Sequence, residues 1–392
     1  MLTWLIAVLR FLHLRDNAGM LPRGDQFYDP MFKLRPLLTH MKHKFGEYFV
    51  PSEHIAIDEA MIAYDGRVYF KQYMPQKPTK WGIKVWEVTD SATGYCLDFD
   101  VFGGKERRRS AYGVGYDVIH KLSQRYLNKN YHLYFDRYFT GLPIIEYLHR
   151  NGTYASGTVR LDRKGLPKAA KTVKLERGAS VFYQKNNTNI VLTTWRDKRQ
   201  VNLLSSCASD RVDAQGKPDA IVKFNKYMGG VDLSNQLCTY YRVGRPSHKW
   251  WRYVFWFVVN VAITNAWLLF KASVSAERLA QTSSHKKFVL ELTEELENEF
   301  SSRRKAVGRP VRRRIPVRPL ALDRDHGHEL IKFDGRALKC WECALQGRRT
   351  LRGYKKETTT KCKQCDVALC RGPCFLNFHT PANAVNDAEM SE

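Results

Sequence analysis

The sequence predicts an α/β protein, with a core of strands and helices followed by a small cysteine-rich domain. Three observations lead to this prediction. Strand-like alternation of apolar residues, at Ile55 and Ile57 within 54–70 and again over 131–135, is followed by apolar segments of helical length. Between 160 and 219 the pattern changes to short β-like runs separated by charged turns. Six of the nine cysteines lie between Cys340 and Cys374. A chain of 392 residues, 44% of them hydrophobic, is long enough for two folded units.

Three stretches each place an aspartate beside an apolar element. Asp58, in HIAIDEAMIAYDGR, lies near the middle of a predicted strand, where a charge without a partner is costly. Asp136 follows the strand-like YHLYF and precedes a break that begins a helix over 142–149. Asp232 follows a diglycine at the start of another helix, where an ordinary first-turn acid is the alternative. Because Mg²⁺ or Mn²⁺ is held by a few carboxylates and activates attack on phosphodiesters, the three acids predict such a metal site.

A long apolar stretch over 250–270 has the length of a membrane span. Asn260, Thr264 and Asn265 interrupt it, and no other membrane signal accompanies it. We therefore predict a buried core helix and no membrane contact. The segment 288–300 has the pattern of an amphipathic packing helix.

The charge of the chain favours a polyanionic partner. Lys and Arg number 64 against 39 Asp and Glu, a formal net charge of +25, although a ribosomal or membrane-surface protein can have a similar composition. The segment 301–319 contains eight Lys or Arg, three prolines and no acid, and predicts an extended basic linker. Its Gly-Arg-Pro tripeptide is similar to the centre of an AT-hook, while a nuclear-import signal or nonspecific phosphate contact remains open. The candidate DNA contacts here are Arg309, Arg312, Arg313 and Arg314.

The C-terminal cysteines have metal-ligand spacing. Pairs two or three residues apart can direct both sulfurs to one tetrahedral zinc ion, and the lack of a secretory signal disfavours disulfides. The candidate ligands are Cys340, Cys343, Cys362, Cys365, Cys370, Cys374 and His379, one fewer than two closed sites need. Between the pairs, Arg348 and Arg349 lie in a basic loop suited to phosphate contact, with a solvated surface as the alternative.

Four motifs together resemble the transposase domain of the piggyBac family, in the same order: KPTKWGIKVWEVTDSATGYCLDFDVFGGK, YFDRYFTGLPIIEYL, NKYMGGVDLSNQ and SHKWWRYVFWFVVNVAITNAWLLF. The resemblance covers 11–272 and resumes over 340–379. It implies a ribonuclease H-like catalytic core with a β-rich insertion, whose acids gather at one sheet edge. It also implies a homodimer in the nucleus that cuts double-stranded DNA at transposon ends and joins those ends to TTAA targets.

Carried over residue by residue, the resemblance makes Asp58, Asp136 and Asp232 the catalytic, magnesium-binding acids. The family has a fourth aspartate three residues after the third, on the same helix face, and this chain has Asn235 there. An amide oxygen can still bind a cation, but one negative charge is lost and metal binding should weaken. The resemblance also supplies an eighth zinc ligand, His328, with His326 as the alternative, and implies that the two zinc sites are cross-braced.

The implied organisation divides the chain into seven parts. They are the remnant of an N-terminal dimerisation and DNA-binding region (1–45), the first part of the core (46–159), the β-rich insertion (160–219), the remainder of the core (220–300), the basic linker (301–322), the zinc domain (323–380) and a tail (381–392). We expect a piggyBac-like transposase or a domesticated derivative. The alternative, a catalytically inactive DNA-binding or chromatin protein, is favoured by Asn235 and by the short region before Asp58, whereas three intact acids favour an enzyme.

Overall fold

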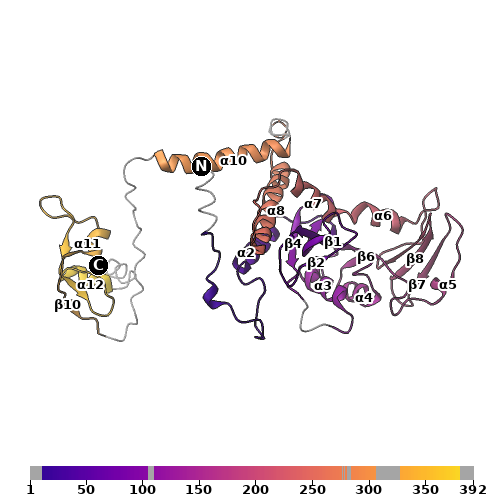
Figure 1. Cartoon of the computed structure of the whole chain (residues 1–392), viewed down its shortest axis with the longest axis horizontal. Coiled ribbons are helices and arrows are strands. Elements are labelled where there is room, and N and C mark those ends of the chain that lie inside the picture. The colour runs from indigo at the N-terminus through magenta and orange to yellow at the C-terminus, as the bar shows by residue number, and fades with distance from the viewer. Residues whose placement is uncertain are drawn as a thin grey trace, which may run out of the picture. The chain divides into compact units, whose positions relative to one another are not determined.

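The chain divides into two compact units, Met1–Glu295 and Leu296–Glu392, and each is described by itself. The computed structural model describes residues 11–104, 110–275, 277, 279, 284–305 and 327–379 (Figure 1).

The first unit is built on a nine-stranded mixed sheet. Eight of its strands follow the order β2-β3-β1-β5-β6-β9-β8-β7, and β4 also pairs with β3. The central strand β1 is antiparallel to β3 and parallel to β5, which is parallel to β6. The strands are β1 (His54–Ala63), β2 (Gln72–Tyr73), β3 (Trp81–Asp90), β4 (Cys96–Val101), β5 (His132–Phe135), β6 (Tyr154–Thr158), β7 (Ser180–Gln184), β8 (Val191–Arg196) and β9 (Gln200–Ser205). The predicted α/β class is confirmed.

The three short β-like runs of 160–219 form β7, β8 and β9. These strands are joined to the main sheet, because β9 pairs antiparallel with β6. Without this pairing, β6 would be an edge strand with unpaired backbone N–H and C=O groups. Figure 1 shows β7 and β8 at the end of the sheet remote from α2 (Arg35–Tyr48).

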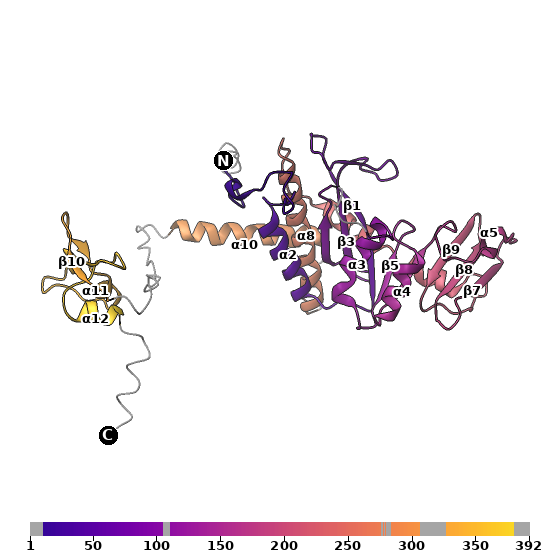
Figure 2. The same cartoon turned by 90° about the horizontal axis from the view of Figure 1, so that it is seen from below.

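Helices cover both faces of the sheet. On one face α7 (Gly230–Tyr240) packs against β1 and β3, α8 (Trp250–Ser273) against β1, and α2 against β4 and α8, as Figure 2 shows for α2 and α8. On the other face α3 (Val114–Ser123) and α4 (Leu142–Arg150) pack together, and α4 contacts β6. The other α-helices described in this unit are α5 (Ala169–Thr172) and α6 (Asp219–Tyr227), while α10 (His285–Lys305) continues into the second unit.

Helix α8 is the one described helix long and apolar enough to cross a membrane by length and composition. The polar side chains in its middle nevertheless form hydrogen bonds inside the core. Asn265 accepts a hydrogen bond from the Cys96 amide at 2.9 Å and donates one to the Cys96 carbonyl at 2.8 Å. Thr264 is also buried. Because α8 packs against α2, α7 and β1, it is a core helix of this unit.

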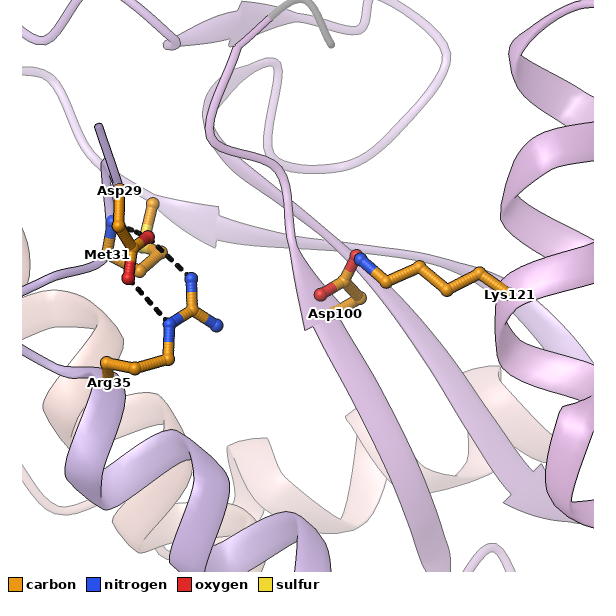
Figure 3. A network of polar contacts seen from close by, with 5 residues as sticks. All are labelled: Asp29, Met31, Arg35, Asp100 and Lys121. Carbon is orange, nitrogen blue, oxygen red and sulfur yellow. Dashed lines mark hydrogen bonds and ion pairs between the residues drawn. The ribbon is translucent and has the colours of Figure 1, made fainter. Parts of the chain in front are cut away.

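Two ion pairs flank the edge of the sheet at β4 (Figure 3). The Asp29 carboxylate accepts hydrogen bonds from Arg35 Nε at 2.7 Å, from Arg35 Nη2 at 2.6 Å and from the Met31 amide at 2.9 Å. Asp100, on β4, pairs with Lys121 of α3 at 2.7 Å. A cavity of about 550 Å³ is lined by both pairs. The Asp29–Arg35 pair anchors the start of α2, and the Asp100–Lys121 pair ties α3 to β4.

The second unit is small and has few apolar side chains in its core. Its strands pair as β10 (Leu330–Lys332) with β13 (Thr360–Cys362) and β11 (Leu338–Lys339) with β12 (Glu357–Thr358). Two short helices, α11 (Trp341–Leu345) and α12 (Pro373–His379), complete it. The buried core consists of four cysteines with Leu369 and Phe378. So small a core is typical of domains that depend on bound metal.

Candidate functional site

Asp58 and Asp136 meet where β5 ends beside β1. The last pair of residues shared by the two strands is Ile57 and Phe135, so each aspartate follows that pair directly. Beyond it the edge of β1 is open, and carboxylate oxygens of Asp58, Glu59 and Asp136 lie within 4.8 Å of one another. Three carboxylates this close could hold a divalent cation. Glu59 was missed in the sequence, where only its position next to Asp58 pointed to it.

Burial makes this cluster electrostatically unusual. The pKa of Asp58 is raised to about 7: burial is the largest cause, Lys77 opposes the rise, and the nearby charges of Glu59 and Asp136 add to it. Burial likewise raises the pKa of Glu59. One Glu59 oxygen, Oε2, is buried and has no hydrogen-bond partner among the described residues. An unpartnered carboxylate oxygen in such a cluster fits a cation ligand.

Two lysines lie against the acids. Lys77 Nζ is 3.8 Å from Asp58 Oδ2 and donates a hydrogen bond of 3.0 Å to the Glu59 carbonyl. Lys84, which is only 8% exposed, lies 4.0 Å from Glu59 Oε1 and over the ring of Tyr138. The ammonium groups offset part of the negative charge.

A fourth acid, Glu87, lies beneath the cluster. It is the cross-strand partner of Asp58 in β3 and is 1% exposed. Neither of its carboxylate oxygens has a hydrogen-bond partner in the described part of the chain, and burial raises its pKa to about 8. The signal in the sequence is a glutamate inside the otherwise apolar run VWEV.

The third predicted acid, Asp232, lies in the first turn of α7 and is exposed, with Asn235 half-buried one turn later. The group formed by Asp58, Glu59 and Asp136 does not include it. Helix α7 begins directly on the sheet at Gly230, because a Cβ there would lie 2.6 Å from Thr89 Oγ1. The structure therefore brings two of the three predicted acids together and places the third on α7, which packs against β1.

A basic groove lies at the end of β1. Its volume is about 860 Å³, and its lining includes Arg67, Arg242, Arg245 and His248. Among the residues that the structure describes, none forms an ion pair with the three guanidinium groups. Sequence reasoning missed this groove because its arginines come from distant parts of the chain.

Asn260 of α8 holds the loop that carries two of these arginines. Its Oδ1 accepts a hydrogen bond from the Val243 amide at 2.7 Å, and its Nδ2 donates one to the Val243 carbonyl at 2.8 Å. Val243 lies between Arg242 and Gly244, so the clamp fixes the backbone in the middle of the basic loop. The Tyr64 hydroxyl at the end of β1 donates to the His248 carbonyl at 3.1 Å. Hydrogen bonds from the uncharged side chains of Asn260 and Tyr64 thus preorganise the groove.

In the second unit, His328, Cys362, Cys365 and His379 form one potential metal site. His328 Nδ1 lies 3.5 Å from the Cys362 sulfur and 3.4 Å from the Cys365 sulfur, and His379 Nε2 lies 3.6 Å from the latter. The other His379 nitrogen, Nδ1, is 2.7 Å from the Phe375 carbonyl and can donate to it. That contact leaves Nε2 directed at the sulfurs, the arrangement usual for a metal-binding histidine. His326, the alternative ligand, lies outside the described residues.

The other four cysteines, Cys340, Cys343, Cys370 and Cys374, form a second group of potential ligands. The sulfurs of Cys343 and Cys374 are 3.4 Å apart, and the Cys370 amide donates to the Cys340 sulfur at 3.3 Å. The ligands of the two groups interleave along the chain. Both groups have the number, element types and proximity that two tetrahedral metal ions need.

The predicted DNA contacts are divided between described and undescribed parts of the chain. Arg348 and Arg349 are exposed in the loop after α11. Arg309, Arg312, Arg313 and Arg314, together with most of the 301–322 linker and the 381–392 tail, lie outside the described residues. The predicted roles of those residues stay predictions.

Comparisons with known proteins agree with the resemblance. A family model described as Transposase IS4 matches residues 6–267. Human PiggyBac transposable element-derived protein 3 is 29% identical over 94% of this chain and 61% of its own length. Human PiggyBac transposable element-derived protein 2 is 26% identical over 67% of this chain and 47% of its own. The chain thus spans less than two thirds of the length of each of these relatives.

A solved structure shares the fold. The cryo-EM structure of a piggyBac transposase synaptic complex with hairpin DNA superimposes with a TM-score of 0.68, covering 93% of this chain and 77% of the other at 23% identity. The family match covers more than half of the chain and includes all three predicted acids, Asp58, Asp136 and Asp232. The chain belongs to the piggyBac-type transposase family.

Proposed function

We propose that this chain is a piggyBac-like DNA transposase or a domesticated derivative, which cuts DNA strands at TTAA sites and joins them with the help of divalent metal. The observation that carries the proposal is the cluster of Asp58, Glu59 and Asp136 carboxylates, within 4.8 Å of one another at the end of β5. The strand order β4-β3-β1-β5-β6, antiparallel up to β1 and parallel from β1 onward, supports a ribonuclease H-like core.

The acid cluster suits Mg²⁺ or Mn²⁺. These ions would polarise the scissile phosphate and lower the pKa of the attacking water. Asp58 and Asp136 would bind them, with Glu59 beside them, and Asp232 would join from α7. Lys77 and Lys84 would contact phosphate oxygens next to the acids. Asn235 supplies an amide oxygen where the family has a carboxylate, which lowers the negative charge available to a cation.

DNA is the proposed partner because of charge and shape. The formal charge of +25 and the unpaired arginines of the groove at the end of β1 favour a polyanion. The groove lies at Ala63 and beyond, five positions along β1 from Asp58, which is about 17 Å at the rise of a strand. A DNA strand passing the acids could therefore reach it within a few nucleotides. We further propose a homodimer located in the nucleus, as family membership and the basic composition suggest.

Two Zn²⁺ ions are proposed for the second unit. The thiolate and imidazole ligands and the four-fold grouping are those of closed structural zinc sites. They would brace the loops that carry Arg348 and Arg349, which we propose as DNA contacts together with the linker arginines.

The second candidate function is a DNA-binding or chromatin protein without catalysis. It is favoured by Asn235 and by the position of Asp232 outside the acid cluster. This function would use the basic groove and the cysteine-rich unit, and it does not depend on the acid cluster.

Assays of strand nicking and hairpin formation on a duplex ending in TTAA, run with Mg²⁺ and with Mn²⁺, distinguish these two functions. The natural chain is compared with Asn235→Asp, with Asp136→Ala and with Asp197→Ala, an exposed acid in the β8–β9 turn as control. Metal-dependent cleavage that Asp136→Ala abolishes and Asp197→Ala keeps supports the enzyme. Cleavage only in Asn235→Asp indicates a metal site weakened by one charge. No cleavage by either chain, with DNA still bound, supports the second function.

A further inference from the structure

A basic hairpin tip, residues 347–356, follows α11 in the cysteine-rich unit. At its end Leu351 is fully exposed and Tyr354 is 72% exposed. A leucine with no protein contact on any side loses the free energy that burial would give it, about 1.5–3 kcal/mol. Single exposed apolar residues are common on protein surfaces. The exposure of Leu351 is therefore informative only together with the residues that surround it.

The hairpin tip is held firmly in shape. The Thr350 amide donates to the Tyr354 carbonyl and the Gly353 amide to the Thr350 carbonyl, both at 2.8 Å. Arg349 Nη1 donates to the Gly353 carbonyl at 3.1 Å. Leu351 lies inside this closed turn, so its side chain is presented by a backbone that need not be ordered on binding.

Both ends of the hairpin tip are tied to the second metal-ligand group. The Arg348 amide donates to the Cys343 carbonyl at 2.8 Å, and the Cys340 amide donates to the Lys356 carbonyl at 3.1 Å. Cys340 and Cys343 are two of the four potential ligands of that group. The metal site would thus fix the direction in which the hairpin tip projects.

The charge around Leu351 has one sign. Residues 347–356 contain five Lys or Arg and no Asp or Glu. In the described part of the chain no ion pair involves any of these cations. The unpaired cations are Arg348, Arg349, Arg352, Lys355 and Lys356. An apolar side chain at the end of a rigid, entirely basic hairpin matches a surface that has closely spaced anions and an apolar interior.

We propose that the hairpin tip is a DNA wedge. Its cations contact phosphates on the two sides of a minor groove, and the Leu351 side chain enters between neighbouring base pairs, unstacks them and bends the duplex. This proposal rests on the proposed function only in taking DNA as the partner. An anionic membrane would offer the same charge, but insertion into lipid depends on a larger apolar area than one leucine and a tyrosine provide.

The wedge is tested with the full, metal-loaded chain and an A/T-rich duplex of about 30 base pairs with a dye at each end, so that energy transfer reports bending. Leu351→Ser is compared with Leu376→Ser, a leucine 64% exposed on α12 of the same unit. We expect the natural chain and Leu376→Ser to bend the duplex by about 20–90°. Leu351→Ser should abolish the bend and weaken binding about tenfold. Leu351→Phe should retain the bend.

Salt dependence separates the wedge from the phosphate contacts. Arg352→Gln should lower the slope of log K against log salt by about 0.9, and Leu351→Ser should leave that slope unchanged. Equal bending by the natural chain and Leu351→Ser, or equal losses in Leu351→Ser and Leu376→Ser, overturns the wedge and leaves the proposed function intact. Tight binding to phosphatidylserine vesicles with no duplex binding overturns the wedge and counts against the proposed function as well.

Discussion

Asp58 and Glu87 are cross-strand partners in β1 and β3, so two carboxyl groups face the same side of the sheet at neighbouring positions. Acids placed directly opposite each other repel when both are ionised. Asp58 reaches the open edge of the sheet at the end of β5, while Glu87 remains in the core with no hydrogen bond to either oxygen among the described residues. Asp58 is therefore available to bind a cation, whereas burial favours the neutral form of Glu87.

Replacing Glu87 by Gln should alter how stability depends on pH. Because burial raises the folded-state pKa of Glu87 from 4.5 to about 8, its stabilising contribution is full below pH 4.5 and is lost as the pH rises towards 8. Near pH 8 we expect Glu87→Gln to exceed the natural chain in free energy of unfolding by on the order of 3 kcal/mol, and near pH 4.5 to match it. Urea unfolding followed by tryptophan fluorescence, without divalent cation, measures the difference.

The matched control for this substitution is Glu294→Gln, an exposed glutamate on α10. It should leave the pH dependence of stability as it is in the natural chain. A natural chain whose stability rises between pH 5 and pH 8 relative to Glu87→Gln would contradict the assignment of a neutral, buried Glu87.

Cation binding by the acid cluster should weaken in mild acid. Asp58 must lose its proton to bind a metal, and its pKa of about 7 places that loss near neutral pH. Below pH 7 the affinity for Mn²⁺ should fall by about tenfold per pH unit. Calorimetric titration of the natural chain at several pH values measures this fall. Asp58→Asn should bind weakly at every pH, and Asp197→Asn should behave as the natural chain; a flat affinity between pH 6 and pH 8 would argue against Asp58 as a ligand.

The contrast between Asp58 and its neighbours explains how much of the site the sequence could predict. Asp58 lies within a strand-like pattern and Asp136 directly follows one, so local alternation is sufficient to select them. The nearness of Glu59 depends on where β5 ends, and the position of Glu87 depends on the register between β1 and β3. Neither property is visible in a local window. The α/β class was predictable for the same local reason, whereas the joining of β9 to β6 is a long-range pairing.

The cysteine-rich unit shows the same limit in another form. Spacing selects the three cysteine pairs, because thiolates two or three residues apart can share one ion. Assignment of each pair to a site depends on how β13 and α12 bring His328 and His379 to Cys362 and Cys365. The arginines of the basic groove are harder still, since Arg67 and Arg245 come together only through the packing of α8 against β1.

Cys362→Ser should remove one of two zinc ions. The three ligands His328, Cys365 and His379 would remain as an incomplete site, which binds zinc far more weakly than four ligands do. Metal analysis should find about two zinc ions per chain in the natural protein and about one in Cys362→Ser. Cys207→Ser, at a cysteine of the first unit that belongs to neither group, is the control and should keep both ions. Two ions retained by Cys362→Ser would show that this cysteine is not a ligand.

Asn260→Leu should weaken DNA binding without any change of charge. The substitution removes both hydrogen bonds to Val243 and leaves a backbone amide and carbonyl without partners, a loss of about 1–3 kcal/mol each. The loop from Arg242 to His248 would then adopt many conformations, and its arginines would no longer be preorganised for phosphates.

Asn265→Leu is the matched control, because Asn265 makes the same pair of contacts to Cys96 from the same helix but lies away from the groove. We expect both variants to lose similar stability to urea, and only Asn260→Leu to bind a duplex at least fivefold more weakly, as one lost hydrogen-bonded contact predicts. Equal DNA affinity in the two variants would mean that the basic groove takes no part in binding.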